Sequence, residues 1–97
     1  MKIYLTAVIK SKSQYLEEVT SVLKQMVVQT RKETACLQYD LHQDINDKNI
    51  FVFYEIWENQ QGLDLHNEQP YIKEFGTLAN HKLETKPMIY LTEIITL

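Results

Sequence analysis

The sequence predicts an α+β protein of the ferredoxin-like class, with a four-stranded antiparallel sheet and helices on one face of that sheet. Three observations support this prediction. Four segments have the composition of strands, the stretches between them have the periodicity of amphipathic helices, and their order is β-α-β-β-α-β. A length of 97 residues allows one domain, residues 1–97, near the lower end of independent folding size.

The first half of the chain predicts a strand, a helix and a hairpin. Residues 3–9 are rich in β-branched side chains, and apolar residues occupy both odd- and even-numbered positions, which is typical of a central strand. From about Ser13 to Thr30, apolar residues recur at three- and four-residue steps, which predicts an amphipathic helix. Residues 36–43 and 50–57 are short strand-like runs joined by polar turn residues, so they predict an antiparallel hairpin.

The second half predicts a broken helix and a last strand. Helical spacing covers residues 59–68 and 70–82, and Pro70 between them is tolerated in the first turn of a new helix. Pro87 then precedes an apolar run over residues 88–95, which predicts the fourth strand.

Composition excludes several classes of function. Ten Lys and Arg against thirteen Asp and Glu give a net charge of -3, which argues against a nucleic-acid partner. No apolar run approaches the ~20 residues that span a bilayer, so neither a membrane segment nor a secretory signal is expected. The single cysteine, Cys36, favours a reducing, cytoplasmic location. Glycine-rich phosphate loops and the usual zinc motifs are absent, so no metal site is expected.

The predicted third strand is apolar on both of its faces. One face carries Ile50, Val52, Tyr54 and Ile56, and the other carries Phe51, Phe53 and Trp57. Because helices from one chain cover only one face of a sheet, the aromatic face requires another cover, and a second copy of the sheet is the simplest one. The sequence therefore predicts a homodimer with sheets packed face to face, through an interface of Phe51, Phe53, Glu55 and Trp57.

His66 is the leading candidate for chemistry. It is expected in the middle of a helix, in phase with Leu63 on the side that faces the sheet. An imidazole there can act as a base or a hydrogen-bond donor near neutral pH. The alternative interpretation is a structural histidine that hydrogen-bonds a backbone carbonyl.

Other polar groups give weaker indications. A hairpin turn centred after Asp47 would place Asp40 opposite Glu55, where the two carboxylates could form an acid–base pair or each bind a cation or amide. His42 and His81 have no partner at metal-ligand spacing. A set of aromatic residues is typical of a core but could also line a pocket for a flat, apolar ligand with a few hydroxyls. Its members are Tyr39, Tyr54, Trp57, Tyr71 and Phe75.

Three linked segments resemble the antibiotic biosynthesis monooxygenase domain family, and in particular its small quinol-monooxygenase-like members. The segments are Tyr39-Asp40-Leu41-His42-Gln43-Asp44, Phe53-Tyr54-Glu55-Ile56-Trp57-Glu58, and His66-x-x-x-Pro70-Tyr71 followed by Phe75. The resemblance implies a dimeric α/β-barrel with one pocket per subunit between sheet and helices, and no metal, haem or flavin. It places the commonly matched residues at Glu55, Trp57, His66 and Pro70.

The chain departs from the family pattern in places. Thr34-Ala35 replaces a frequent Pro-Gly, and Ile72 stands where an aromatic residue is common. Thr6 and His66 occupy positions where the haem-degrading branch has Asn and Trp, so haem degradation is disfavoured.

The resemblance implies a cofactor-independent monooxygenase that reacts a small quinol-type aromatic substrate with molecular oxygen. In this interpretation His66 is the base or proton relay. Tyr39, Tyr54 and Tyr71 donate hydrogen bonds to substrate oxygens, and Trp57 and Phe75 pack against the substrate ring. Two alternatives stay open. One is an isomerase or lyase for a small polar or phosphorylated metabolite, for which Arg31 and Lys73 are the nearest cations. The other is a ligand-binding dimer without catalysis.

Overall fold

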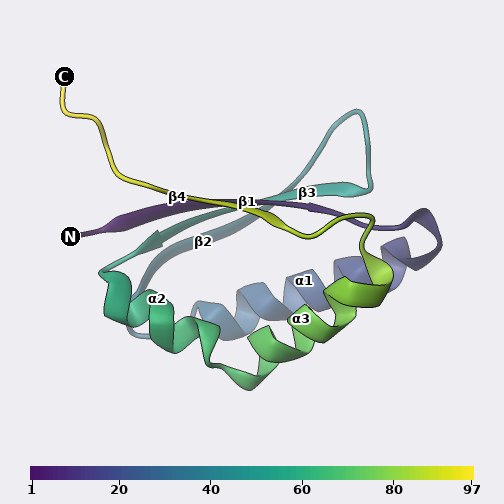
Figure 1. Cartoon of the computed structure of the whole chain (residues 1–97), viewed down its shortest axis with the longest axis horizontal. Helices are drawn as coiled ribbons and strands as arrows, with labels where there is room; N and C mark the ends of the chain where they lie inside the picture. Colours follow the sequence, from purple (N-terminus) through teal and green to yellow (C-terminus); the bar gives the residue numbers. More distant parts are fainter.

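The four strands form one antiparallel sheet in the order β2-β3-β1-β4. This is a computed structural model that describes residues 1–97, and its helices all lie on one face of the sheet (Figure 1). The elements in chain order are β1 (Ile3–Lys10), the 3-10 turn η1 (Ser13–Tyr15), α1 (Leu16–Thr30), β2 (Cys36–Gln43), β3 (Ile50–Trp57), α2 (Gln60–Asn67), α3 (Pro70–Lys82) and β4 (Met88–Thr92). The predicted ferredoxin-like fold is confirmed.

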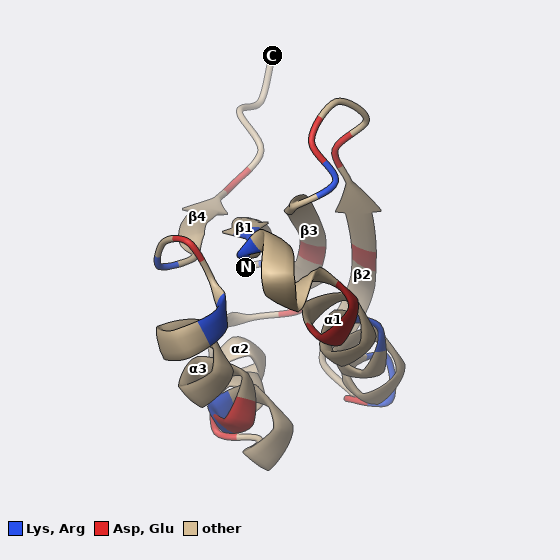
Figure 2. Ribbon diagram, turned by 90° about the vertical axis from the view of Figure 1, so that its right-hand side faces the viewer, with Lys and Arg blue, Asp and Glu red and all other residues tan.

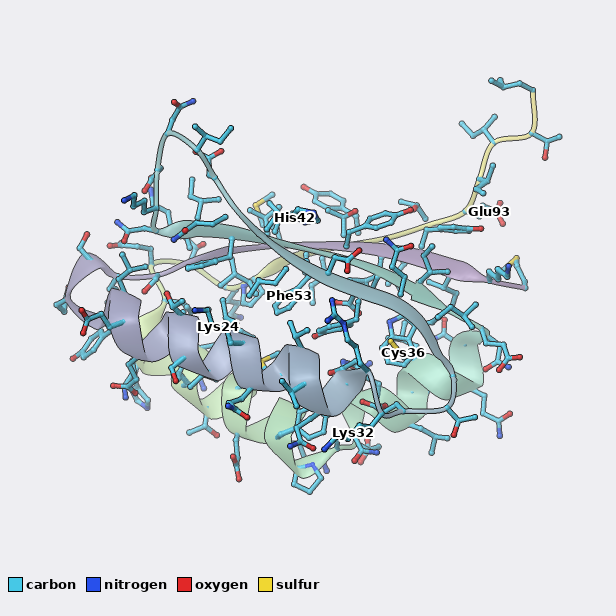
Figure 3. The ribbon with its side chains drawn as sticks, turned by 180° about the vertical axis from the view of Figure 1, so that it is seen from behind. Lys24, Lys32, Cys36, His42, Phe53 and Glu93 are labelled. Atoms are coloured by element: carbon cyan, nitrogen blue, oxygen red, sulfur yellow. The ribbon has the colours of Figure 1, made fainter.

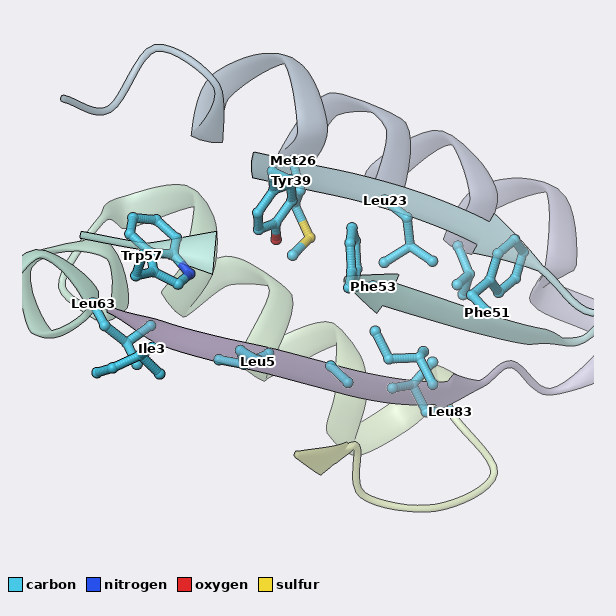
Figure 4. Packing of buried hydrophobic residues seen from close by; sticks show 13 residues of the cluster. Ile3, Leu5, Leu23, Met26, Tyr39, Phe51, Phe53, Trp57, Leu63 and Leu83 are labelled. Atoms are coloured by element: carbon cyan, nitrogen blue, oxygen red, sulfur yellow. The ribbon is translucent and has the colours of Figure 1, made fainter. Parts of the chain in front are cut away.

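Strand alternation decides which side chains form the core. In β1 and β3 the odd-numbered residues face the helices and are buried, while the even-numbered residues face away. The largest fully buried side chains are Trp57, Phe51 and Phe53, all on β3. Val19 and Leu23 of α1 pack into the same cluster, as Figure 4 shows for Leu23 beside the aromatic rings. Burial of these aromatic and aliphatic side chains therefore holds the helices on the sheet.

The predicted dimer interface of Phe51, Phe53, Glu55 and Trp57 is wrong. These side chains lie under the helices of their own chain and are at most 4% exposed, so no partner surface can reach them. Figure 3 shows Phe53 between the sheet and the helices. Both faces of β3 are apolar, and the alternation by itself does not say which face the helices cover. The bulkier face became the interior because burying it removes more apolar surface from water.

The opposite side, which we call the open sheet face, carries the even-numbered residues of β1, β3 and β4. Its apolar side chains are Tyr4, Val8, Ile50, Val52, Tyr54, Ile56, Met88 and Tyr90. No element of the chain covers them, and His42 lies on this side of the sheet in Figure 3. Charged residues lie mainly on the helices and loops, and β2 and β3 carry one acidic residue each (Figure 2). The open sheet face is therefore largely apolar on β1, β3 and β4, whereas β2 contributes polar residues to it.

The hairpin register differs from the predicted one by one residue. Tyr39 is opposite Glu55, and Asp40 is opposite Tyr54. The Asp44 carboxylate accepts the backbone N–H groups of residues 46 and 47, and the Asp44 N–H donates to the Ile50 carbonyl at 2.9 Å. This side-chain capping fixes a six-residue loop, 44–49. Because side chains alternate with a period of two, the shift places Asp40 and Glu55 on opposite faces, and the hypothesised carboxylate pair does not form.

Two further differences lie at strand ends. A register irregularity between Cys36 and Gln38 turns Leu37 outward, where its side chain is 49% exposed, although the alternation had placed it in phase with Tyr39. The last strand ends at Thr92 instead of residue 95.

None of the helices combines the length and the apolar character needed to cross a membrane.

Candidate functional site

A cavity of about 100 Å³ lies between the sheet and the helices. Every strand and all three α-helices contribute to its walls, which are mostly aliphatic and aromatic. Its polar side chains are Tyr39, Glu55, His66 and Asn67. A small apolar chamber with a few polar groups has the character of a binding site for a compact organic molecule.

Two local features of α2 position His66 at this cavity. The Asn59 side chain caps the helix by accepting the Gly62 backbone N–H at 2.7 Å. Gly62 allows close approach, because a Cβ there would lie 2.3 Å from the Ala35 Cβ. Leu63 and His66, one turn apart, therefore face the sheet, and His66 is only 4% exposed.

A carboxylate from another part of the chain meets this imidazole. Glu33, in the connection between α1 and β2, places Oε2 2.7 Å from His66 Nδ1. The Tyr71 hydroxyl donates to the same oxygen and lies 3.4 Å from Thr30 Oγ1. Burial, together with donation to Glu33, raises the pKa of Tyr71 to about 12, so this hydroxyl stays protonated. Glu33 is thus held by two donors and in turn orients the ring of His66.

This arrangement defines the protonation state of His66. Burial lowers the pKa of His66 below its ordinary value, and the hydrogen bond and charge of Glu33 oppose that effect without reversing it. The neutral ring with Nδ1–H directed at Glu33 leaves Nε2 as its free acceptor. A histidine that is oriented by a carboxylate and keeps one free ring nitrogen can act as a general base.

Glu55 is the second titratable group at the cavity. Its side chain is buried, and Oε1 accepts a hydrogen bond from Trp57 Nε1 at 2.8 Å. Burial raises the pKa of Glu55 to about 7, and the bond from Trp57 opposes this shift only in part. Near neutral pH the carboxyl group therefore exchanges a proton readily.

Aromatic rings enclose His66. The Trp57 ring centroid lies 4.5 Å from that of His66, and those of Tyr39 and Tyr71 lie 5.8 Å and 6.3 Å away. Burial and the neighbouring Glu55 raise the pKa of Tyr39 above its ordinary value, so this residue can donate a hydrogen bond but not accept a proton near neutral pH.

The structure brings together most of the site residues named from the sequence. Tyr39, His66 and Phe75 line the cavity, and Trp57 and Tyr71 contact His66 at its edge. Tyr54 does not join them. It lies on the open sheet face, opposite the helices, so its assignment to the pocket is wrong. Successive side chains of β3 point to opposite faces, so Tyr54 lies outside and Glu55, the next residue, lies inside.

Sequence reasoning missed Glu33. It follows the last turn of α1, in a stretch with no periodicity, and no motif marks it.

Cys36 is half-buried, and burial and the neighbouring Glu55 raise the pKa of its thiol to about 11. His42 and His81 are exposed, on β2 and at the end of α3. No three His, Cys, Asp or Glu side chains come together as a metal site.

The raised pKa of Glu55 predicts a pH-dependent effect of Glu55→Gln on stability. With a folded pKa of about 7 against an ordinary 4.5, the folded chain holds a proton that the unfolded chain releases between these values. The contribution of Glu55 to stability is full below pH 4.5 and is lost as pH rises through 7. Urea unfolding from pH 4.5 to 8 should show the variant gaining stability relative to the parent chain. Glu58→Gln, at an exposed position, is the control. A stability difference independent of pH would contradict the burial argument.

The chain is similar to a described protein family and to two curated relatives. Residues 2–77 match the family model described as antibiotic biosynthesis monooxygenase. The Bacillus subtilis protein named "Putative monooxygenase YcnE" is 30% identical over 92 residues, which cover 95% of this chain and 97% of that protein. The Synechocystis sp. protein sll1783 is 34% identical over 67 residues, covering 69% of this chain but only 46% of that longer relative.

A solved structure shows the same fold. The crystal structure of PA3566 from Pseudomonas aeruginosa superposes with a TM-score of 0.91 at 27% identity, covering 98% of this chain and 95% of that one. Together with the match over residues 2–77, this confirms the resemblance inferred from the Glu55-x-Trp57 and His66-x-x-x-Pro70 segments. The chain belongs to the antibiotic biosynthesis monooxygenase family.

Proposed function

We propose that this protein is a cofactor-independent monooxygenase that oxygenates a small quinol-type aromatic substrate. The observation that carries the proposal is the buried pair of His66 and Glu33, 2.7 Å apart, at the wall of an apolar cavity. Family membership and the name of the Bacillus subtilis relative support the reaction class.

The size of the cavity favours a substrate with one ring. Its volume is about 100 Å³, whereas sites for drug-sized ligands span about 300–1,000 Å³. Phe53, Ile72 and Phe75 are among the apolar wall residues that would contact the faces of a flat ring. Tyr39 and Asn67 would hydrogen-bond its hydroxyl oxygens.

The first step is formation of the substrate anion. His66 takes a hydroxyl proton at Nε2, and the Glu33 carboxylate stabilises the imidazolium that results. Because Glu33 is already in place and hydrogen-bonded by Tyr71, little reorganisation is needed when the charge develops. The total charge of the substrate, His66 and Glu33 together does not change when the proton moves.

The electron-rich anion then reacts with molecular oxygen. It transfers one electron to oxygen, and the radical and superoxide combine to form a carbon–oxygen bond at a ring carbon next to the oxyanion. The imidazolium of His66 protonates the peroxide, and loss of water leaves a new carbonyl at that carbon. In sum, a hydroquinone and O₂ give a hydroxyquinone and water, with the substrate itself as the source of electrons.

Oxygen uptake and isotope incorporation test this function. The purified protein with a single-ring hydroquinone under ¹⁸O₂ is expected to consume oxygen and to place one labelled atom in the product and one in water. Oxygen uptake at the rate of the protein-free solution, across a panel of hydroquinones, would overturn the proposal. Binding without uptake would instead favour the ligand-binding alternative.

The isomerase or lyase alternative has less support. It requires cations that converge on a polar or phosphorylated ligand. The side chain of Arg31 is 57% exposed and pairs with Asp40, and that of Lys73 is 63% exposed and pairs with Glu68. Neither cation lines the cavity.

We also propose that the protein is a homodimer, formed through the open sheet face defined above. Contiguous apolar side chains on three neighbouring strands favour a cover of the same chemistry, and a second open sheet face provides one. The predicted packing of sheet on sheet is retained, but through the even-numbered residues of β3 instead of the odd-numbered ones.

Val52→Asp is expected to produce a folded monomer. Val52 lies on the open sheet face of the inner strand β3, where a carboxylate would be desolvated in the dimer but solvated in the monomer. Sedimentation velocity should show the loss of the dimer, and circular dichroism should show the fold retained. Val28→Asp, at a half-exposed position on α1, is the control and should stay dimeric. A dimer that persists in Val52→Asp would contradict this interface.

A further inference from the structure

The mechanism above leaves one titratable group at the cavity without a role. Glu55 is 4% exposed, lines the same cavity as His66, and receives the Trp57 Nε1–H at 2.8 Å. Its neighbours across the sheet are Tyr39 on β2 and Leu5 on β1. A carboxyl group is rarely buried on the core face of a central strand unless it is paired, and here its single hydrogen-bond partner leaves the other oxygen free.

The water-forming step of the proposed reaction requires a second proton transfer. When the ring hydroperoxide loses water, the hydrogen on the oxygenated carbon must leave as a proton while the oxygen–oxygen bond breaks. His66 has by then returned its own proton to the peroxide, so the acceptor in this step is either the neutral His66 or another basic group of the cavity. Of the four polar side chains that line the cavity, only His66 and Glu55 can accept a proton near neutral pH, because Tyr39 is a phenol and Asn67 is an amide.

We propose that Glu55 is the second acid–base residue of this cavity and takes the ring-carbon proton in the water-forming step. This inference rests on the proposed monooxygenase function. The carboxylate takes the proton, the electron pair of the C–H bond forms the new carbonyl, and the oxygen–oxygen bond breaks. The departing hydroxide receives the proton from Glu55 and leaves as water, which returns the carboxylate to its starting state.

The surroundings of Glu55 match this role. The titratable groups of the cluster are Cys36 and Tyr39 on β2, Glu33 before β2, His66 on α2 and Tyr71 on α3. On β1 and α1, the cavity residues are apolar. Burial and the charge of Glu33 hold the pKa of Glu55 at about 7, so the group both accepts and returns a proton at neutral pH.

Glu55→Gln with ring-deuterated hydroquinone tests the inference. The amide oxygen of Gln still accepts the Trp57 N–H, so the variant keeps the hydrogen bond but cannot accept a proton. We expect oxygen uptake to persist, formation of hydroxyquinone to fall at least tenfold, hydrogen peroxide to be released instead, and a primary deuterium isotope effect to appear. Unchanged product formation without an isotope effect would overturn the role of Glu55.

Trp57 provides a readout that does not depend on turnover. It is the only tryptophan in the chain and donates to Glu55, so its fluorescence should change with pH with a midpoint near 7. That transition should be lost in Glu55→Gln and kept in His66→Ala. In the parent protein, the acid limb of the kcat/KM profile, which reports groups of the free enzyme, should share this midpoint, which tests the proposal even if the variant fails to fold. Two different midpoints would overturn it.

The controls separate this inference from the proposed function. If the parent protein consumes no oxygen with any hydroquinone, both are overturned. If the parent protein oxygenates the hydroquinone and Glu55→Gln does so in the same way, the proposed function stands and the role of Glu55 is overturned.

Discussion

His66→Ala is expected to lower the turnover of a single-ring hydroquinone by about 10²–10⁴-fold, the range typical for loss of a general base. The imidazole is the one cavity group backed by a carboxylate, so no other side chain can form the substrate anion with the same support. Oxygen-electrode rates under saturating substrate measure the effect. The variant should remain folded, because Glu33 keeps the hydrogen bond from Tyr71.

The matched control for this prediction is His42→Ala. His42 is an exposed histidine on β2 and faces away from the cavity, so its removal should leave turnover unchanged. Turnover in His66→Ala within a factor of two of the parent rate would remove His66 from the mechanism.

Phe53→Ala is expected to lower the free energy of unfolding by about 3–5 kcal/mol. This is a large share of the roughly 5–15 kcal/mol that stabilises a typical domain. Phe53 is 1% exposed, its ring centroid lies 4.9 Å from that of Tyr39, and truncation would leave a cavity between the sheet and α1. Urea unfolding at two protein concentrations provides the measurement.

Tyr54→Ala, one residue along the same strand, serves as the comparison. Tyr54 lies on the open sheet face, so its loss should weaken dimerisation and give a stability change that depends on protein concentration. The change in Phe53→Ala should not depend on concentration. A stability change that depends on protein concentration in Phe53→Ala but not in Tyr54→Ala would contradict this assignment of the interior and the interface.

Strand and helix positions could be predicted closely from local patterns. The predicted strands 36–43 and 50–57 coincide with β2 and β3, and Pro70 marks the start of α3 as expected. Alternation and helical periodicity are properties of neighbouring residues, so they can be read without knowledge of the fold. The prediction of His66 at a sheet-facing position follows from the same periodicity, and its burial agrees with that prediction.

The faces of the sheet and the hairpin register could not be predicted in the same way. Phe53 and Val52 lie on opposite faces, both apolar, and only the packing of α1 and α2 distinguishes inside from outside. The register depends on Asp44, whose side chain binds loop N–H groups and shifts the partner of Asp40 by one residue. A shift of one position is enough to move Glu55 away from Asp40 and toward Tyr39.

The sequence alone determined the order of the elements, the family resemblance and the candidacy of His66, because each depends on residue types at short spacings. The tertiary structure decided which face of β3 became the interior, that Glu33 binds His66, and that Glu55 shares a cavity with them. Glu33 and His66 are 33 positions apart in the chain. Only the packing of α2 against the sheet and the α1–β2 connection brings them together, because a contact between distant residues leaves no local pattern in the sequence.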